Sequence, residues 1–219
     1  GYAVESGMFF AALGHGTVAA VTLLFFTYPV FVTIGSWALG RGAPARPTVV
    51  ALLAAMAGSA IVVGTGVGLE IRTLGVAFAL GSAVTYSCYL IGADVLLRRT
   101  DPLTSAMWVS AGASIGLFVF ANAVGEWRAP LSIEWWPLLG MGLASGGAFL
   151  CLMEGIRRIG AVRTAIVSAM EPLAAAALAW VFLGEAVTWG LVLGGSLILV
   201  AAVITSVARA ATAQEQQIP

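Results

Sequence analysis

The chain has 219 residues, of which 60% are hydrophobic and only 9% are charged, whereas a soluble domain carries about 25% charged residues. The formal net charge is zero and the ten basic residues, all arginine, are scattered, which excludes a nucleic-acid-binding surface and argues against a soluble domain. Two distant cysteines, Cys88 and Cys151, and one histidine cannot form a standard zinc site. We therefore expect no nucleic-acid partner, no metal and no cofactor.

Seven long stretches carry almost no charge, and each is long enough to cross a bilayer. A hydrocarbon core of about 30 Å requires about 20 apolar residues of helix, and barrel strands are far shorter than these stretches. The segment that precedes them covers only about 20 Å as a helix, too short to cross alone, and it predicts a chain truncated at its N-terminus. The predicted helices lie at about 1–13, 17–40, 47–66, 73–97, 104–125, 136–156, 162–183 and 188–208.

The arginines can be assigned to two sides of the membrane, because successive loops alternate between the sides. One side receives only Arg72 and Arg128. The other receives the remaining eight, namely Arg41, Arg46, Arg98, Arg99, Arg157, Arg158, Arg163 and Arg209. Loops rich in positive charge face the cytoplasm. We therefore expect an inner (plasma) membrane protein with a cytoplasmic C-terminus, and a polar tail at 210–219 that is disordered from Thr212 onwards.

A shift of 143 residues aligns two regions of the chain. It places Pro29 on Pro172 and Trp37 on Trp180, and it aligns the flanking apolar stretches. The shift contains an odd number of predicted crossings, so the two copies must enter the bilayer in opposite senses. Inverted repeats are typical of secondary transporters, with the substrate site near the midplane between the repeats. The predicted fold is an all-α, polytopic membrane helix bundle with inverted repeats, with about seven full spans and one partial span.

The most specific motif is Glu171-Pro172 inside a membrane helix, followed by an apolar run that ends in Leu183-Gly184-Glu185. This segment resembles the second repeat of EamA-type proteins of the drug/metabolite transporter superfamily. Tyr28-Pro29 resembles the first repeat more weakly, because no glutamate precedes Pro29. The resemblance implies ten helices in two five-helix repeats. On that basis 1–66 is the remnant of the first repeat, and 73–209 is the complete second repeat.

The resemblance implies a carrier that exports a small organic metabolite, such as an amino acid, by alternating access, with proton exchange if Glu171 changes protonation. A non-transporting subunit, a sensor or an inactive truncated remnant is the alternative. An enzyme is disfavoured because the chain lacks a histidine cluster or a nucleophile beside a base. ATP-driven pumping is disfavoured because there is no phosphate-binding loop and no lysine. The glycine pairs Gly112/Gly116 and Gly142/Gly146 indicate helix packing and give no support for an oligomer.

Glu171 is the leading candidate for the functional site, because it lies about 12 Å along the helix from Arg163. A carboxylate at that depth must be paired, hydrated or protonated, so it either faces a cavity or bonds to a neighbouring helix. Pro172 and Pro29 each remove a backbone donor, which predicts a kink that is either a hinge or static. Glu5 is a possible second acid of the cavity, or a hydrated group near the chain end.

Aromatic side chains complete the candidate set, and three further polar groups receive structural roles. Tyr28, Trp37 and Trp180, together with Tyr86 and Tyr89, either stack on an organic substrate or simply pack. The helical spacing predicts ion pairs of Glu154 with Arg157 and Arg158, and of Asp94 with Arg98. His15 is predicted to lie on the outer face of the membrane, where a surface histidine is favoured over a proton relay.

Overall fold

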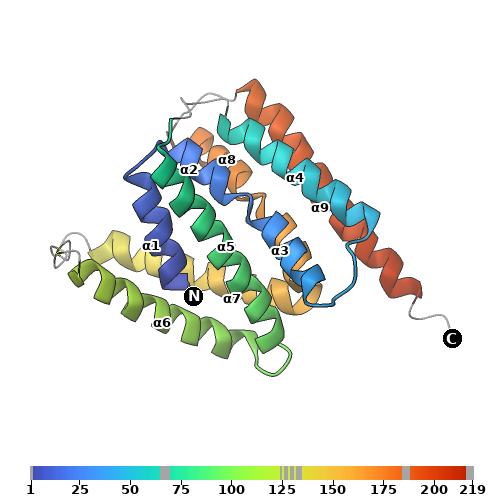
Figure 1. The fold of residues 1–219 in the computed structure, drawn as a ribbon, viewed down its shortest axis with the longest axis horizontal. Coiled ribbons are helices and arrows are strands. Elements are labelled where there is room, and N and C mark those ends of the chain that lie inside the picture. The colour runs from blue at the N-terminus through green and yellow to red at the C-terminus, as the bar shows by residue number, and fades with distance from the viewer. Residues whose placement is uncertain are drawn as a thin grey trace.

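Helices form the whole regular structure of the described part of the chain (Figure 1). The computed structural model describes residues 2–64, 70–123, 125, 128, 131, 135–183 and 188–215. Their helices are α1 (Tyr2–Leu13), α2 (Val18–Phe25), α3 (Tyr28–Ala38), α4 (Arg46–Gly64), α5 (Thr73–Leu96), α6 (Pro102–Ala123), α7 (Trp135–Ser168), α8 (Glu171–Leu183) and α9 (Trp189–Glu215). The prediction of an all-α bundle is confirmed.

Within the described residues, five segments are long and apolar enough to cross a membrane, which fits a multi-pass protein. They are Val18–Ala38, Arg46–Gly64, Thr73–Leu96, Pro102–Ala123 and Trp135–Ser168. Three shorter apolar helices accompany them, at Tyr2–Leu13, Glu171–Phe182 and Trp189–Thr205. Large apolar side chains such as Leu143 and Trp189 are exposed on the outer faces of the bundle, as lipid-facing side chains are.

Two of the predicted helices are each interrupted near their middle, which corrects the sequence-based boundaries. The expected helix at 17–40 is divided into α2 and α3 by Phe26 and Thr27. The expected helix at 162–183 is divided before Glu171 by Ala169 and Met170. The two interruptions are separated by the shift of 143 residues that aligns the prolines, so equivalent positions of the two copies break in the same way.

A second correction concerns the expected loop after 136–156. The helix continues to Gly160, and the following helical segment is joined directly to it, so that both lie within α7. Gly160 itself has φ 80° and ψ 162°, a backbone conformation that side chains with a Cβ adopt only with strain. Gly160 therefore turns the chain between the two segments, where the sequence predicts a break.

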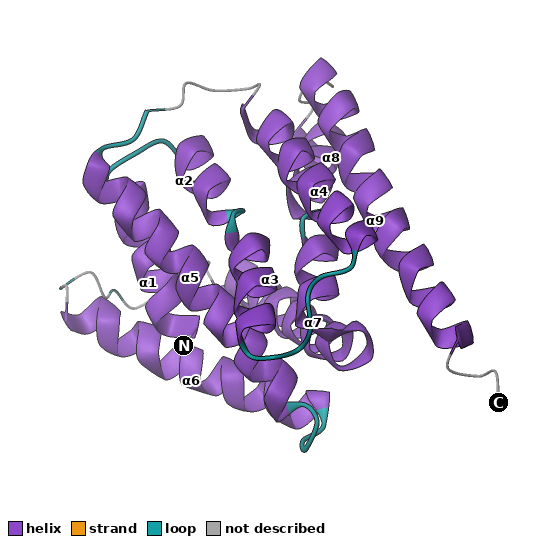
Figure 2. Cartoon of the chain, turned by 45° about the vertical axis from the view of Figure 1, so that its right-hand side comes forward, coloured by secondary structure: helices purple, strands orange, loops and turns teal. Residues whose placement is uncertain are grey.

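The equivalent helices α4 and α9 lie side by side and run antiparallel in both views (Figures 1 and 2). Gly58 lies against Gly194 and Ile198, while Gly194 lies against Val62. A Cβ atom on Gly194 would lie 2.5 Å from the carbonyl oxygen of Gly58, so the two backbones meet without side chains between them. Antiparallel packing of equivalent helices is what copies of opposite sense require.

Three further expectations need correction or fall outside the described residues. The polar tail is helical as far as Glu215, because the alanines between Ala208 and Ala213 favour helix. A methyl group added at Gly142 or Gly146 would meet no neighbouring atom within 4 Å, whereas Gly116 packs against Ala3. Residues 184–187, which include the predicted Gly184-Glu185, and residues 216–219 lie outside the described part of the chain.

Candidate functional site

The four tyrosines of the chain gather in one aromatic cluster, although they come from three helices. Tyr86 of α5 stacks on Tyr89 with ring centroids 5.9 Å apart and meets the edge of Tyr28 of α3 at 4.9 Å. Tyr2 of α1 lies 6.1 Å from Tyr89 and 4.8 Å from Phe149 of α7. These edge and stacked arrangements are the favourable geometries for aromatic rings. The cluster thus joins helices from both predicted repeats.

Tyr28 is the buried centre of this cluster, with 1% of its surface exposed. Its hydroxyl donates to the carbonyl oxygen of Ala165 in α7 at 3.4 Å. The hydroxyl of Ser87 lies 3.0 Å from the carbonyl oxygen of Tyr28, which lies next to the break. The side chain and backbone of Tyr28 therefore tie the first helix break to α5 and α7.

Glu5 is a buried acid beside the cluster, with 6% of its surface exposed. Its two carboxyl oxygens accept hydrogen bonds from Ser6 and from Ser82 of α5, each at 3.1 Å. Buried carboxyl groups are retained where such donors compensate for the loss of water. Glu5 is thus an integral part of the contact between α1 and α5, and not a hydrated group at a chain end.

Glu171 occupies a different environment from Glu5, because its side chain is exposed. It is the first residue of α8, directly after the second helix break. Its carboxyl group lies close enough to interact electrostatically with Glu5, Tyr28 and Tyr86. Within the described residues no hydrogen bond or ion pair engages this carboxyl group. The structure therefore places an acid within electrostatic reach of Tyr28 and Tyr86.

Pro29 and Pro172 each lie in the first turn of the helix that follows a break, so the predicted kinks are complete interruptions of the helix. Pro29 is in the first turn of α3, and Pro172 follows the first residue of α8. The first turn of a helix has no partner for its amide groups, so proline fits there without losing a bond. Both prolines are buried, and each fixes the point at which the chain resumes its helix after a break.

Trp37 and Trp180 lie outside the tyrosine cluster. They occupy equivalent positions on α3 and α8, and their exposed fractions are similar, 58% and 55%. No ring contact joins either tryptophan to a tyrosine in the part of the chain that the structure describes. Of the candidate residues, the structure brings together Glu5, Tyr28, Pro29, Glu171 and Pro172, and leaves the two tryptophans apart.

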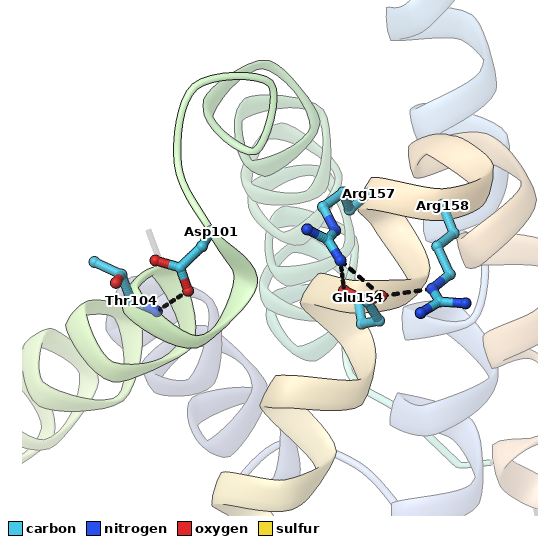
Figure 3. A network of polar contacts seen from close by, with 5 residues as sticks. All are labelled: Asp101, Thr104, Glu154, Arg157 and Arg158. Atoms are coloured by element: carbon cyan, nitrogen blue, oxygen red, sulfur yellow. Dashed lines mark hydrogen bonds and ion pairs between the residues drawn. The ribbon is translucent and has the colours of Figure 1, made fainter.

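The remaining polar predictions have mixed outcomes. Glu154 pairs with Arg157 and Arg158 as predicted (Figure 3). Asp94 instead pairs with Arg41 in the loop after α3, because the chain folds back over the end of α5. His15 is half-buried at the turn after α1, with its ring 6.0 Å from Phe78, so its ring packs against α5 while part of it stays exposed.

Residues 73–207 match the EamA-like transporter family. The chain belongs to this family. The matched range contains α5, α6, α7 and α8 completely and includes both Glu171 and the second helix break.

Relatives of this EamA-family chain carry the name of transporters. It is 28% identical over 188 residues to YcbK, an uncharacterized transporter of Bacillus subtilis. This alignment covers 80% of the present chain and 59% of YcbK. It is 26% identical over 179 residues to the uncharacterized transporter sll1319 of Synechocystis, and this alignment covers 78% of the present chain and 53% of sll1319. The chain thus spans little more than half the length of these two relatives. A protein of known crystal structure shares the fold, with a TM-score of 0.79 and 21% identity, covering 92% of this chain and 73% of that one.

Two residues of this candidate site were not predicted, Tyr2 and Ser82. The helical spacing contains information about both. Ser82 precedes Tyr86 and Tyr89 by four and seven residues, so the three share one face of α5. Tyr2 and Glu5 are three residues apart on α1. A search for polar side chains at helical spacing, in place of single charged residues, would have found them.

Proposed function

We propose that the protein is the membrane-embedded part of a secondary transporter that exports a small organic metabolite, with amino acids as the first class to test. The observation that carries the proposal is that two acids, Glu5 and Glu171, lie within electrostatic reach of each other and of the tyrosine cluster, close to the two helix breaks. A carboxylate next to aromatic faces suits an ammonium group, and tyrosine hydroxyls suit a carboxylate. An amino acid carries both groups.

In the proposed mechanism, the breaks before Tyr28 and Glu171 let α3 and α8 change their angle relative to α2 and α7. Interrupted helices are the usual site of substrate binding in inverted-repeat carriers. Glu171 binds the cationic group of the substrate or a proton, and Glu5 remains held by Ser82. Export coupled to proton entry follows if Glu171 is protonated on one side of the membrane and deprotonated on the other.

The test is uptake of a panel of radiolabelled amino acids into proteoliposomes that contain the wild-type chain, Glu171→Gln or Glu70→Gln. Glu70 is a matched control because its side chain is exposed outside the helices. We expect flux of at least one amino acid in the wild type and in Glu70→Gln, and a loss of about tenfold or more in Glu171→Gln, since a hydrogen bond to a charged group contributes about 1.5–3 kcal/mol. A pH-sensitive dye inside the vesicles would report proton movement with the substrate.

Equal flux in the wild type and Glu171→Gln would remove this acid from the mechanism. No flux across a broad panel would favour the alternative, a non-transporting subunit, sensor or inactive remnant.

We also propose an inner-membrane location with the C-terminus in the cytoplasm, and a division into a first-repeat remnant at 1–66 and a second repeat at 73–209. The bias of arginines supports the orientation, and the antiparallel packing of α4 and α9 supports the two copies. Single cysteines at Glu70 and Arg99, in a variant without Cys88 and Cys151, should react with an impermeant reagent from opposite sides. Reaction of both from the same side would overturn the topology.

A further inference from the structure

A polar cavity lies apart from the tyrosines, where the ends of α3 and α5 meet the glycine break of α7. Its volume is about 580 Å³. Arg41, Asp94, Arg98 and Arg163 line it, together with Ser36 and Gly160. None of the four tyrosines lines it. We call this space the arginine cavity.

The charges of the arginine cavity do not balance. Three arginines face one acid, and that acid, Asp94, forms an ion pair with Arg41. Across the described ranges no carboxylate pairs with Arg98 or Arg163. Guanidinium groups bind phosphate and carboxylate oxygens strongly, often through two parallel hydrogen bonds. Two arginines without acidic partners on one cavity therefore favour an anionic ligand.

A buried hydroxyl provides a second, independent observation. Ser36 has 5% of its surface exposed, and its Oγ atom has no hydrogen-bond partner among the described residues. Ser36 lines the arginine cavity. Buried polar atoms in proteins nearly always have partners, so an unpaired hydroxyl on a polar cavity indicates a ligand atom or a water in that space.

The backbone of α7 also favours an anionic ligand in the arginine cavity. Gly160 interrupts the helix, so Ala161, Val162 and Arg163 form the first turn of the next helical segment, and all three line the cavity. The N-terminal end of a helix favours negative charge. The arginines, the hydroxyl and the helix end thus point to the same kind of ligand.

We propose that the arginine cavity is an oxyanion site, in which Arg98 and Arg163 bind a phosphate or carboxylate group and Ser36 donates a hydrogen bond to it. Asp94 competes with the ligand for Arg41. The oxyanion belongs either to a soluble metabolite or to a lipid headgroup, since both present the same group. This site is independent of Glu171, and it can exist whether or not the chain transports an amino acid.

The test measures the thermal unfolding midpoint of the purified chain in lipid nanodiscs. In one arm, inorganic phosphate is titrated against sodium chloride at equal ionic strength, in nanodiscs of phosphatidylcholine alone. In the other arm, phosphatidylglycerol replaces part of the phosphatidylcholine and no phosphate is added. We expect stabilisation in at least one arm. Stabilisation by inorganic phosphate identifies a soluble ligand, and stabilisation by phosphatidylglycerol alone identifies a lipid headgroup.

Variants distinguish this site from general charge effects. We expect Arg98→Gln and Arg163→Gln to weaken the apparent affinity about tenfold, as expected for one charge-assisted bond. Arg99→Gln is the matched control, because Arg99 neighbours Arg98 but does not line the cavity. Asp94→Asn should tighten binding, a change that damage to the fold would not produce. No stabilisation in either arm, or equal responses from the wild type, Arg98→Gln and Arg163→Gln, would overturn the proposal.

Discussion

The two helix breaks share one backbone hydrogen bond but carry different side chains. At the first break the amide of Thr27 donates to the carbonyl oxygen of Leu24 at 3.1 Å, and at the second the amide of Met170 donates to that of Val167 at 3.0 Å. These bonds are equivalent under the shift of 143 residues. The next residue is a tyrosine in one copy and a glutamate in the other, each followed by proline.

This difference separates a structural role from a chemical one. Tyr28 is buried, and its hydroxyl donates a hydrogen bond to the backbone of α7, so it fixes the first break to that helix. Glu171 at the equivalent position is exposed and has no such bond among the described residues. The first break therefore supports packing through Tyr28, and the second presents the carboxyl group of Glu171. Replacing each side chain tests this division directly.

The largest expected effect is the loss of the Tyr28 side chain. Tyr28→Ala should lower the free energy of unfolding by about 3–5 kcal/mol, because it leaves a cavity where a large aromatic side chain was buried. Glu171→Ala should leave the unfolding free energy nearly unchanged and abolish flux. Chemical unfolding in detergent measures the first quantity, and proteoliposome flux measures the second. Equal destabilisation by the two variants would contradict the division of roles.

The next largest effect is expected where the two copies meet. Gly194→Ala should destabilise the chain by about 1–3 kcal/mol, the usual effect of overpacking, because the new methyl group would lie 2.5 Å from the backbone oxygen of Gly58. Gly146→Ala is the control, since a methyl group there meets no atom within 4 Å. It should be neutral or slightly stabilising, as alanine favours helix. Unfolding midpoints of both variants in the same detergent provide the comparison.

The sequence was sufficient to predict the helical membrane fold and a break between the helices at 136–156 and 162–183, where Gly160 lies. It did so because long apolar stretches and repeated prolines are local properties of the chain. The two prolines predicted kinks close to the breaks, but complete interruptions at Phe26-Thr27 and Ala169-Met170 were not predicted, because no glycine occupies these positions. Their stability comes from contacts between helices, such as the bond from Tyr28 to Ala165.

The site was predicted in part for the same reason. A buried acid such as Glu5, or an acid within a span such as Glu171, stands out in an apolar sequence. The partner of a side chain does not, because it depends on which helices pack together. Asp94 has a suitable arginine four residues away, but Arg41 reaches it from another part of the bundle, 53 residues apart in the chain. Ser82 likewise becomes part of the site only through the contact of α5 with α1.

A smaller effect is expected from the contact that distinguishes Glu5 from Glu171. Ser82→Ala removes one of the two hydroxyl donors to Glu5 and should destabilise the chain by about 1 kcal/mol, the net contribution of a typical hydrogen bond. Ser196→Ala is a suitable control, because Ser196 bonds within its own helix, to the oxygen of Val192. We expect almost no change there. If both variants have the same unfolding midpoint, Ser82 does not stabilise the buried acid.

The smallest effect is expected at the start of α6, which has the side-chain cap that α3 lacks. Thr27 precedes α3 without a side-chain capping bond. At the start of α6, by contrast, a carboxyl oxygen of Asp101 accepts a hydrogen bond from the amide of Thr104 at 3.0 Å (Figure 3). The helix breaks therefore depend on packing between helices, and the start of α6 depends on a local bond in the aqueous loop. Hydrogen bonds from the side chain of Thr104 and, to a smaller extent, from its backbone amide lower the pKa of Asp101.

A lowered pKa in the folded chain means that this cap stabilises α6 fully above the usual pKa of an aspartate. The stabilisation is then lost as the pH falls through the lower folded value. Asp101→Ala should therefore reduce the unfolding midpoint slightly at neutral pH, and the deficit should shrink in acid. Asp101→Asn should keep the midpoint, because asparagine caps helices as well as aspartate does. A deficit shared by Asp101→Asn would mean that the charge of Asp101, and not its cap, stabilises the start of α6.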